Sequence, residues 1–294
     1  MHKYLSKFFI DLIFLFLVTS VLIIFRADYL GLLSILLVCF VVILMTNHWR
    51  PASSILYTAL LLRLATMIIG EYLILPDSYG DTDNFEKKAW MWSQGSFANT
   101  LGNFPGPQSF FISWLGAIPY SLFERSILML RAMSLLFGMG SVLLGWLIVK
   151  KIWDNDSARM VGWILALFPS LVLYSTLFLR EPYIYFFLLV AIYGVVDWVK
   201  FGSIKSIIIA SIGFIGAFFF NGPMIIGYFV FLIIIAIFFL KKFLEFIRHG
   251  YIHKQGFIIL LLIILFFGYY FADQLYFPKL GTFSETNFEW AAQR

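Results

Sequence analysis

The chain has 294 residues, of which 62% are hydrophobic and 13% are charged, whereas about 25% of the residues in a typical soluble domain are charged. One water-soluble core cannot bury so much apolar surface at this length, so the composition excludes an ordinary soluble protein and indicates an all-α polytopic membrane protein. The net charge of +5 would suggest a nucleic-acid partner in a soluble protein. Here we expect the basic residues to face anionic lipid, with no nucleic acid bound.

Apolar runs of about the ~20 residues that cross a bilayer recur along the chain and predict about nine transmembrane helices. In chain order they are 8–25, 29–46, 54–75, 131–149, 160–178, 183–199, 206–220, 224–240 and 256–274. We expect the first to be an uncleaved span, because no small-residue cleavage site follows it. Asn221, Gly222 and Pro223 separate the seventh run from the eighth, and they favour a surface turn over a kink in one long helix.

Basic residues such as Lys3, Arg50 and Lys150 gather in alternate loops. By the positive-inside rule this predicts a multi-pass protein of the cell membrane with a cytoplasmic N-terminus and its active face outside. All four histidines then lie on the cytoplasmic side: His2, His48, His249 and His253. A histidine-based metal site or a Ser-His-Asp triad is therefore not expected at the outer face.

The long outer loop, 76–130, contains "FPGPQ" and then a moderately hydrophobic run, "SFFISWLGAIPYSLF". Pro119 interrupts this run, which is too short to span, so we predict an interfacial elbow helix with Trp114 and Tyr120 at headgroup depth. We expect one integral membrane domain over 1–294. Its parts are two additional N-terminal spans at 1–53, a core at 54–199, further spans at 200–274 and an outer tail at 275–294.

Acidic residues open the outer loop in the stretch "SYGDTDNFEKKAW", residues 78–90. Asp81 and Asp83 can converge on one cation, or one can act as a base while the other positions it. Gly80 lets the chain turn before them, and we predict a helix that begins near Asp83 or Asn84. The alternative is an acidic helix cap on a solvated loop, with no chemical role.

A second polar group lies in "LFPSLVLYSTLFLREPYIYFF", residues 167–187. Pro169 should kink its span, and Ser175 and Thr176 can satisfy the carbonyls that the kink frees. Arg180 and Glu181 then stand between two spans, where a carboxylate is costly unless it is used or paired. The alternative is a simple pair between these two residues.

Three arginines have positions that allow a ligand contact. Arg131 should open a span, with Arg125 shortly before it, and guanidinium groups bind phosphate through two hydrogen bonds. The alternative for both is an interfacial side chain that extends to the headgroups. Arg63 lies in mid-span, where a charged side chain normally faces the bundle interior or a cavity. The predicted topology brings one group of residues to the outer face: Asp81, Asp83, Arg131, Arg180 and Glu181.

The order of these motifs resembles the GT-C superfamily of membrane glycosyltransferases, in the branch of the protein O-mannosyltransferases and the lipid A aminoarabinose transferases. The carrying segments are "LLLRLATMIIGEYL", "GDTDNFEKKA", "FPGPQSFFISWLGAIPYSLF" and "YSTLFLREPYIYFF". They extend from about Leu60 to Trp198, and Asp81, Phe85 and Ala89 have the spacing of a motif in which the family often has Tyr at the middle position. The chain resembles a short or truncated member.

This resemblance implies an inverting glycosyltransferase that moves a sugar from a polyprenyl-phosphate donor to a glycan, lipid or protein acceptor of the cell envelope. Asp81 would be the catalytic base, and Asp83 would assist it. Arg131, Arg180 and Glu181 would lie at the lipid-phosphate end of the site, with Arg63 as a further substrate-binding residue. The implied cofactor is a divalent cation at most, with Asp83 and Glu181 as its candidate ligands.

Other functions fit the same residues. A transporter or flippase of a lipid-linked sugar would use the outward polar site without chemistry, with Arg63 and Glu71 along its path, although paired broken helices in two related halves are not evident. A polysaccharide polymerase or ligase would share the lipid carrier. A non-catalytic partner in polysaccharide assembly is the remaining alternative.

Overall fold

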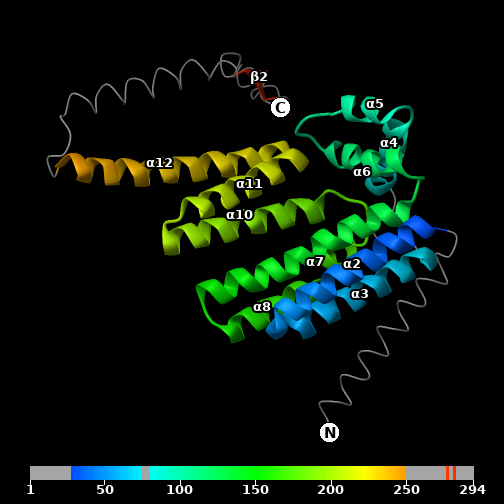
Figure 1. Cartoon of the computed structure of the whole chain (residues 1–294), viewed down its shortest axis with the longest axis horizontal. Helices are drawn as coiled ribbons and strands as arrows, with labels where there is room; N and C mark the ends of the chain where they lie inside the picture. The colour runs from blue at the N-terminus through cyan, green and yellow to red at the C-terminus, as the bar shows by residue number, and fades with distance from the viewer. Residues whose placement is uncertain (1–27, 74–79, 249–275, 278–280, 283–294) are drawn as a thin grey trace, which may run out of the picture. The chain divides into compact units, whose positions relative to one another are not determined.

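The computed structural model describes residues 28–73, 80–248, 276–277 and 281–282. The regular secondary structure of these residues is helical apart from one antiparallel pair of two-residue strands, β1 (Tyr276–Phe277) and β2 (Gly281–Thr282) (Figure 1). The all-α class is therefore confirmed for this part of the chain. The predicted spans at 8–25 and 256–274 lie outside the described residues.

Five helices of the described part are long and apolar enough to cross a bilayer. They are α2 (Tyr29–His48), α3 (Ser53–Tyr72), α7 (Ile127–Ile152), α10 (Glu181–Phe201) and α12 (Ile225–Arg248). Each contains a predicted run or most of one. Helix α11 (Ile204–Phe220) has 17 residues, slightly fewer than the ~20 that a span needs. Asn221 and a short 3₁₀ turn, η2 (Gly222–Met224), separate α11 from α12, so the helix is interrupted where we expected a turn.

The predicted span at 160–178 is wrong as a single helix. Its residues divide between α8 (Asn155–Leu167) and α9 (Pro169–Tyr174), and the stretch from Ser175 to Arg180 is not helical. Proline has no amide hydrogen and its ring disfavours the helical conformation of the residue before it. Phe168 accordingly has extended backbone angles, and Pro169 starts a new short helix instead of only kinking the old one.

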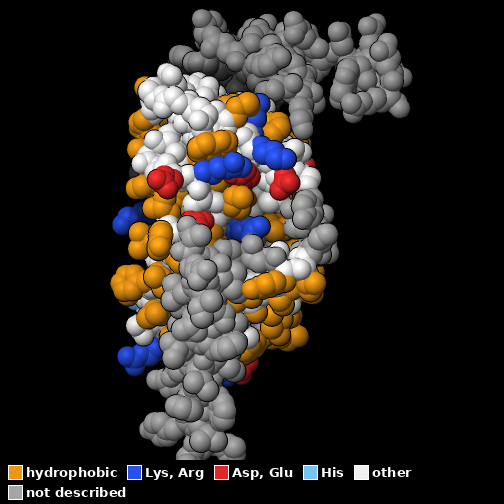
Figure 2. All heavy atoms as spheres, turned by 90° about the vertical axis from the view of Figure 1, so that its right-hand side faces the viewer, with side chains coloured by type: hydrophobic (Ala, Val, Ile, Leu, Met, Phe, Trp, Pro, Cys, Tyr) orange, Lys and Arg blue, Asp and Glu red, His pale blue; other side chains and the backbone are white. Residues whose placement is uncertain are grey.

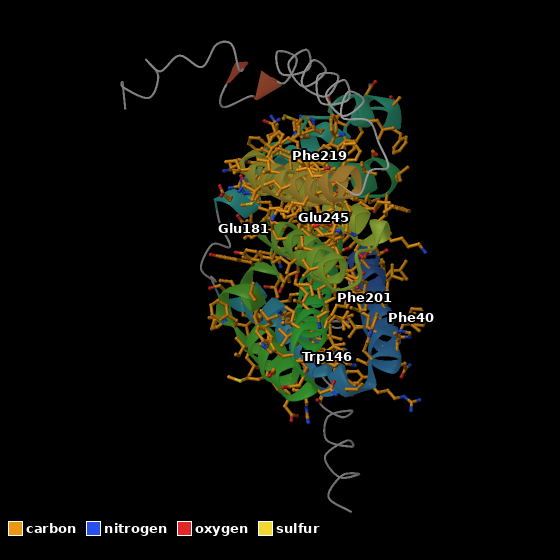
Figure 3. All side chains as sticks on the ribbon, turned by 90° about the vertical axis from the view of Figure 1, so that its left-hand side faces the viewer. Phe40, Trp146, Glu181, Phe201, Phe219 and Glu245 are labelled. Atoms are coloured by element: carbon orange, nitrogen blue, oxygen red, sulfur yellow. The ribbon has the colours of Figure 1, made fainter. Side chains whose placement is uncertain are left out.

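Helices α2, α3, α7 and α8 pack side by side around one apolar core (Figure 1). Its fully buried members include Leu56, Leu60 and Trp146. Phe40, by contrast, is 56% exposed and lies on the outer surface of α2 (Figure 3). An apolar surface of this kind is stable only against lipid or another apolar partner.

The predicted outer loop is largely helical. It forms α4 (Asp81–Ser93), α5 (Phe97–Gly102) and α6 (Phe111–Leu122). Helix α4 begins at Asp81, two residues before the predicted start, and α6 falls within the run expected to be an elbow helix. Its interfacial depth stays a prediction. A second apolar cluster, which includes Phe85, Ile112 and Phe178, packs α4 and α6 against α7 and the segment that leads into α10.

Helices α10 and α11 approach each other through glycine. A Cβ atom on Gly213 would lie 2.2 Å from the backbone nitrogen of Ala191, and one on Gly194 would lie 2.4 Å from that of Ala210. Real Cβ atoms do not approach backbone atoms so closely, so the two helix backbones can touch here only without side chains.

Gly213→Ala is therefore expected to lower the free energy of unfolding by about 1–3 kcal/mol, the usual cost of an overpacked contact. Thermal denaturation of the purified protein would measure it. Gly102→Ala is the matched control, because a Cβ there would meet nothing within 4 Å. Equal stability of the two variants would contradict the close contact.

The chain divides into two compact units, residues 1–229 and residues 230–294. The cavities and polar contacts described below all lie within the first unit.

Candidate functional site

One face of helix α4 carries the predicted catalytic residue. Gly80 has a positive φ of 84°, which glycine adopts without strain, and Asp81 follows as the first residue of the helix. Residues three, four and seven positions apart share one side of a helix. Asp81, Asn84, Phe85 and Lys88 have this spacing, and all four line a cavity of about 430 Å³.

Two distant segments complete the lining of this cavity, called here the Asp81 cavity. Ser109 and Phe110 precede α6, and Arg180 precedes α10. The Arg180 guanidinium donates from Nη1 to Ser109 Oγ, and from Nε to Glu181 Oε1 at 3.4 Å. Arg180, which lines the same cavity as Asp81, therefore ties these two segments together.

Asp81 and Arg180 line the same cavity, but not every candidate joins them. Asp83 is half-buried and does not line the cavity. Arg131 lies one turn inside α7, not at its first residue, and is also outside the lining. Their substrate-binding roles stay predictions.

Glu181, labelled in Figure 3, is the first residue of α10. Its Oε1 atom accepts from Arg180. Its Oε2 atom is buried, and no hydrogen-bond donor reaches it from the residues that the structure describes. Within those residues no cluster of three or more His, Cys, Asp or Glu side chains could hold a metal ion. A divalent cation on Asp83 and Glu181 therefore stays a prediction without added support.

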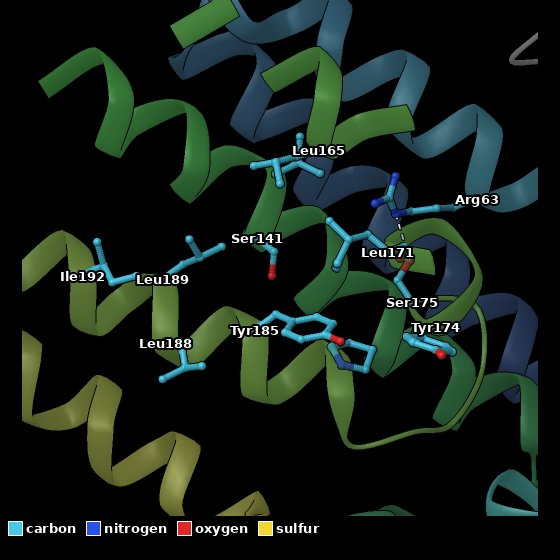
Figure 4. Close-up of a pocket in the computed structure, with 13 residues that line it drawn as sticks. Arg63, Ser141, Leu165, Leu171, Tyr174, Ser175, Tyr185, Leu188, Leu189 and Ile192 are labelled. Atoms are coloured by element: carbon cyan, nitrogen blue, oxygen red, sulfur yellow. Dashed lines mark hydrogen bonds between the residues drawn. The ribbon is translucent and has the colours of Figure 1, made fainter. Parts of the chain in front are cut away.

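Arg63 lines a different cavity, of about 260 Å³, between α7, α9 and α10 (Figure 4). The guanidinium is 1% exposed. Its Nε donates to Ser175 Oγ at 2.9 Å, and its Nη1 donates to the carbonyls of Ala59 and Ala166 at 3.1 and 3.2 Å. Ala166 lies in the last turn of α8, where the break at Pro169 leaves carbonyls without their helical donors.

These contacts give Arg63 a structural task. It supplies a donor to the broken helix and ties α3 to α8 and to the end of α9. Ser175 and Thr176 satisfy further carbonyls, those of Leu171 and Leu173, as the sequence predicted. The surface of this cavity is almost wholly apolar, so it is suited to a hydrocarbon chain and not to a phosphate. This cavity therefore offers no polar surface for the substrate contact that we predicted for Arg63.

An ion pair that sequence reasoning missed holds α4 in place through a buried carboxylate, Glu86. Arg125 Nη2 lies 2.7 Å from Glu86 Oε2, its Nε lies 2.9 Å from Oε1, and Tyr120 donates to Oε1 at 3.0 Å. The guanidinium also lies over the Trp90 ring, 5.4 Å from its centroid. The hydrogen bond to Glu86 raises the pKa of Arg125. Figure 2 shows acidic and basic side chains gathered among hydrophobic ones on the side toward which α4 to α6 lie in Figure 1.

The spacing of residues along α4 could have indicated that Glu86 is buried. Thr82, Glu86, Ala89 and Ser93 recur at helical spacing, and all four are buried. A carboxylate on a buried helix face needs a cation or hydrogen-bond donors beside it. The sequence could not name Arg125, which we expected near a phosphate or in the headgroups.

The Tyr120 hydroxyl predicts how stability depends on alkaline pH. Burial, and then the Glu86 carboxylate, raise the pKa of Tyr120 well above its ordinary value of 10.0. The folded state therefore keeps this proton more tightly than the unfolded chain. The resulting stabilisation is complete below about pH 10 and is lost as the pH rises toward the pKa of the folded state.

Tyr120→Phe has no proton to lose. Above about pH 10 the free energy of unfolding of this variant should fall less steeply with pH than that of the wild type. A series of thermal denaturation curves at increasing pH would measure both slopes, and parallel slopes would contradict the assignment.

Comparisons with protein-family models, with curated proteins and with solved structures gave no match to the chain, so its function is inferred from the site itself.

Proposed function

We propose that the protein is a membrane glycosyltransferase that moves a sugar from a polyprenyl-phosphate donor to a cell-envelope acceptor. The observation that carries the proposal is the Asp81 cavity, whose lining includes a carboxylate from α4 and a guanidinium from the start of α10. A base beside a cation is what displacement of a phosphate leaving group needs. The five apolar helices support a bilayer environment for such a donor.

The reaction proceeds by one displacement. Asp81 accepts the proton of an acceptor hydroxyl, and the hydroxyl oxygen attacks the anomeric carbon of the sugar from the face opposite the phosphate. The new bond between carbon and the acceptor oxygen forms as the bond between carbon and the phosphate oxygen breaks. The electron pair of that bond leaves with the polyprenyl phosphate, and Arg180 stabilises its added negative charge.

Asp81 and Arg180 have suitable supports for these roles. Asp81 is exposed at the first turn of α4, so its carboxylate is accessible to an acceptor hydroxyl. Arg180 is held by Ser109 and Glu181, so its guanidinium is oriented before substrate arrives. With the N-terminus in the cytoplasm, the cavity opens at the outer face of the cell membrane.

Release of polyprenyl phosphate tests the proposal. The purified full chain would be incubated with a labelled polyprenyl-phosphate sugar and an extract of envelope acceptors, and the free lipid phosphate would be separated and counted. Acceptor-dependent release supports transfer. Binding of the donor without release would instead favour a transporter or flippase, and neither binding nor release would favour an assembly partner.

A further inference from the structure

The chain that forms α5 and α6 is uncharged. No acidic, basic or histidine residue occurs between Lys88 and Glu124, although many side chains of this stretch are exposed. On α5 and the turns beside it, the exposed polar side chains are amides and hydroxyls: Gln94, Ser96, Asn99, Asn103 and Gln108. Such a surface suits a partner that is itself polar and uncharged, because an ionic partner would meet no opposite charge.

Helix α5 presents two exposed rows of different chemistry. Residues four positions apart share one side of a helix, so Phe97 lies in line with Leu101, and Asn99 lies in line with Asn103. All four side chains are exposed. Gly102 lies between the two rows, and a Cβ atom there would meet nothing within 4 Å. The surface therefore has an apolar edge, an amide edge and open space between them.

The end of α4 orients two of the amides. Gln94 donates from Nε2 to the Trp90 carbonyl at 3.1 Å, and Asn103 donates from Nδ2 to the Trp92 carbonyl at 3.3 Å. Both carbonyls lie in the last turn of α4, where helical donors are missing. In the part of the chain that the structure describes, neither amide oxygen accepts a hydrogen bond, so both oxygens remain available to a donor from outside.

We propose that this surface, called here the α5 surface and formed by Phe97, Asn99, Leu101, Gly102 and Asn103, binds an uncharged oligosaccharide. The hydroxyl groups at the edge of a sugar ring can donate to the amide oxygens. The C–H groups on the face of the ring can pack against the aromatic side chain, whose face carries partial negative charge. An anionic lipid headgroup would instead need Lys or Arg, which this surface lacks.

The position of the α5 surface indicates how long the ligand is. The amides are bonded to the far end of α4, and Figure 1 shows α5 beside α4 and α6. Helix α4 has 13 residues, so Asp81 lies about 20 Å from that end. A ligand that contacts both places must be a chain of several sugars. That this chain is the acceptor of the transferred sugar rests on the proposed function, whereas its binding does not.

Binding of defined oligosaccharides to the purified full chain in nanodiscs tests the inference. The probes are pentasaccharides of mannose, of glucose and of galactose, with a galacturonic acid pentasaccharide as the anionic counterpart, and saturation-transfer NMR would give each affinity. We expect at least one uncharged chain to bind, and to bind more tightly than the anionic chain, because nothing on the surface offsets the desolvation of its carboxylates. Absence of binding by all three uncharged chains, or preference for the anionic chain, would overturn the proposal.

Two variants assign the binding to α5. Gly102→Leu fills the open space between the rows and should abolish binding, while its thermal unfolding stays close to that of the wild type because the added side chain meets no neighbour. Asn99→Ala removes one hydrogen-bond acceptor and should weaken binding by about fivefold. Asn47→Ala, at an exposed amide of α2, is the matched control and should bind normally. Wild-type affinity in Gly102→Leu would overturn the assignment.

A bilayer is the other partner that an uncharged surface with apolar side chains could contact. Asn99→Cys would be labelled with a fluorophore, since the one native cysteine, Cys39, is buried. In nanodiscs we expect iodide to quench this label freely and a bound oligosaccharide to protect it. Protection from iodide by the lipid alone would identify the bilayer as the partner and overturn the proposal.

The outcome is separable from that of the proposed function. Oligosaccharide binding that depends on Gly102, without any sugar transfer, would leave the α5 surface standing and overturn the glycosyltransferase. If transfer occurs, Asn99→Ala should raise the KM for the acceptor and leave kcat unchanged. Transfer by a protein that binds no oligosaccharide at α5 would overturn only this inference.

Discussion

Asp81→Asn is expected to lower sugar transfer by about 10²–10⁴-fold, the usual contribution of a general base. The amide keeps the size of the carboxylate but cannot accept the proton of the acceptor hydroxyl. Because Asp81 is exposed and makes no side-chain cap on α4, the substitution should leave thermal unfolding almost unchanged. Release of polyprenyl phosphate at saturating donor would measure the loss.

Asp156→Asn is the matched control. Asp156 is also an exposed carboxylate in the first turn of a helix, α8, but it lies outside the Asp81 cavity. This variant should transfer sugar at the wild-type rate. Full transfer by Asp81→Asn, with the control equally active, would remove Asp81 from the chemistry.

Arg125→Met is expected to have the largest effect on stability, a loss of about 2–3 kcal/mol. Removing one partner of a fully buried ion pair costs about 3–5 kcal/mol, because the remaining charge has no partner. The Glu86 side chain is 6% exposed and that of Arg125 is 42% exposed, so solvent reduces this cost. Methionine retains the apolar length of the side chain over Trp90, which leaves the charge as the main difference.

A double-mutant cycle would isolate the pair. Glu86→Gln, Arg125→Met and the double variant would each be denatured, and we expect the double variant to be more stable than the sum of the two single losses predicts. Arg159→Met, at an exposed arginine of α8, should change stability little. Additive losses in the cycle would show that the two side chains act independently.

Loss of this pair should also affect activity. Glu86 lies on the same short helix as Asp81, Asn84 and Lys88, so the ion pair fixes the helix that supplies one wall of the cavity.

The sequence predicted the features that depend on local composition. Runs of apolar residues locate α2, α3, α7 and α10. A run long enough to cross a bilayer is a local property of the sequence, so no distant partner is needed to predict the helix. The meeting of Asp81 with Arg180 was also predictable, since alternating spans bring the ends of their helices to the same face.

Features that depend on distant partners were not predictable. Pro169 predicted a kink in one span. The structure instead has a complete break between α8 and α9, and the break depends on Arg63, a donor from another helix. The burial of Glu86 depends on Arg125 and Tyr120, which lie 39 and 34 residues later in the chain.

Arg63 also has a consequence for the order in which the protein is made. Its donors reach Ala166 and Ser175, which lie 103 and 112 residues later in the chain. At a synthesis rate of about 5–20 residues per second, α3 is complete about 5–20 s before those acceptors exist. During that time the helix carries a mid-span guanidinium that costs about 2.5–3.5 kcal/mol in a bilayer, with only the Ala59 carbonyl of its own helix to accept from it. The apolar residues of α3 must hold it in place until α8 and α9 arrive. A chain that stops before residue 166 would therefore keep the charge of Arg63 in α3 without these acceptors. The finished protein differs from it in this respect.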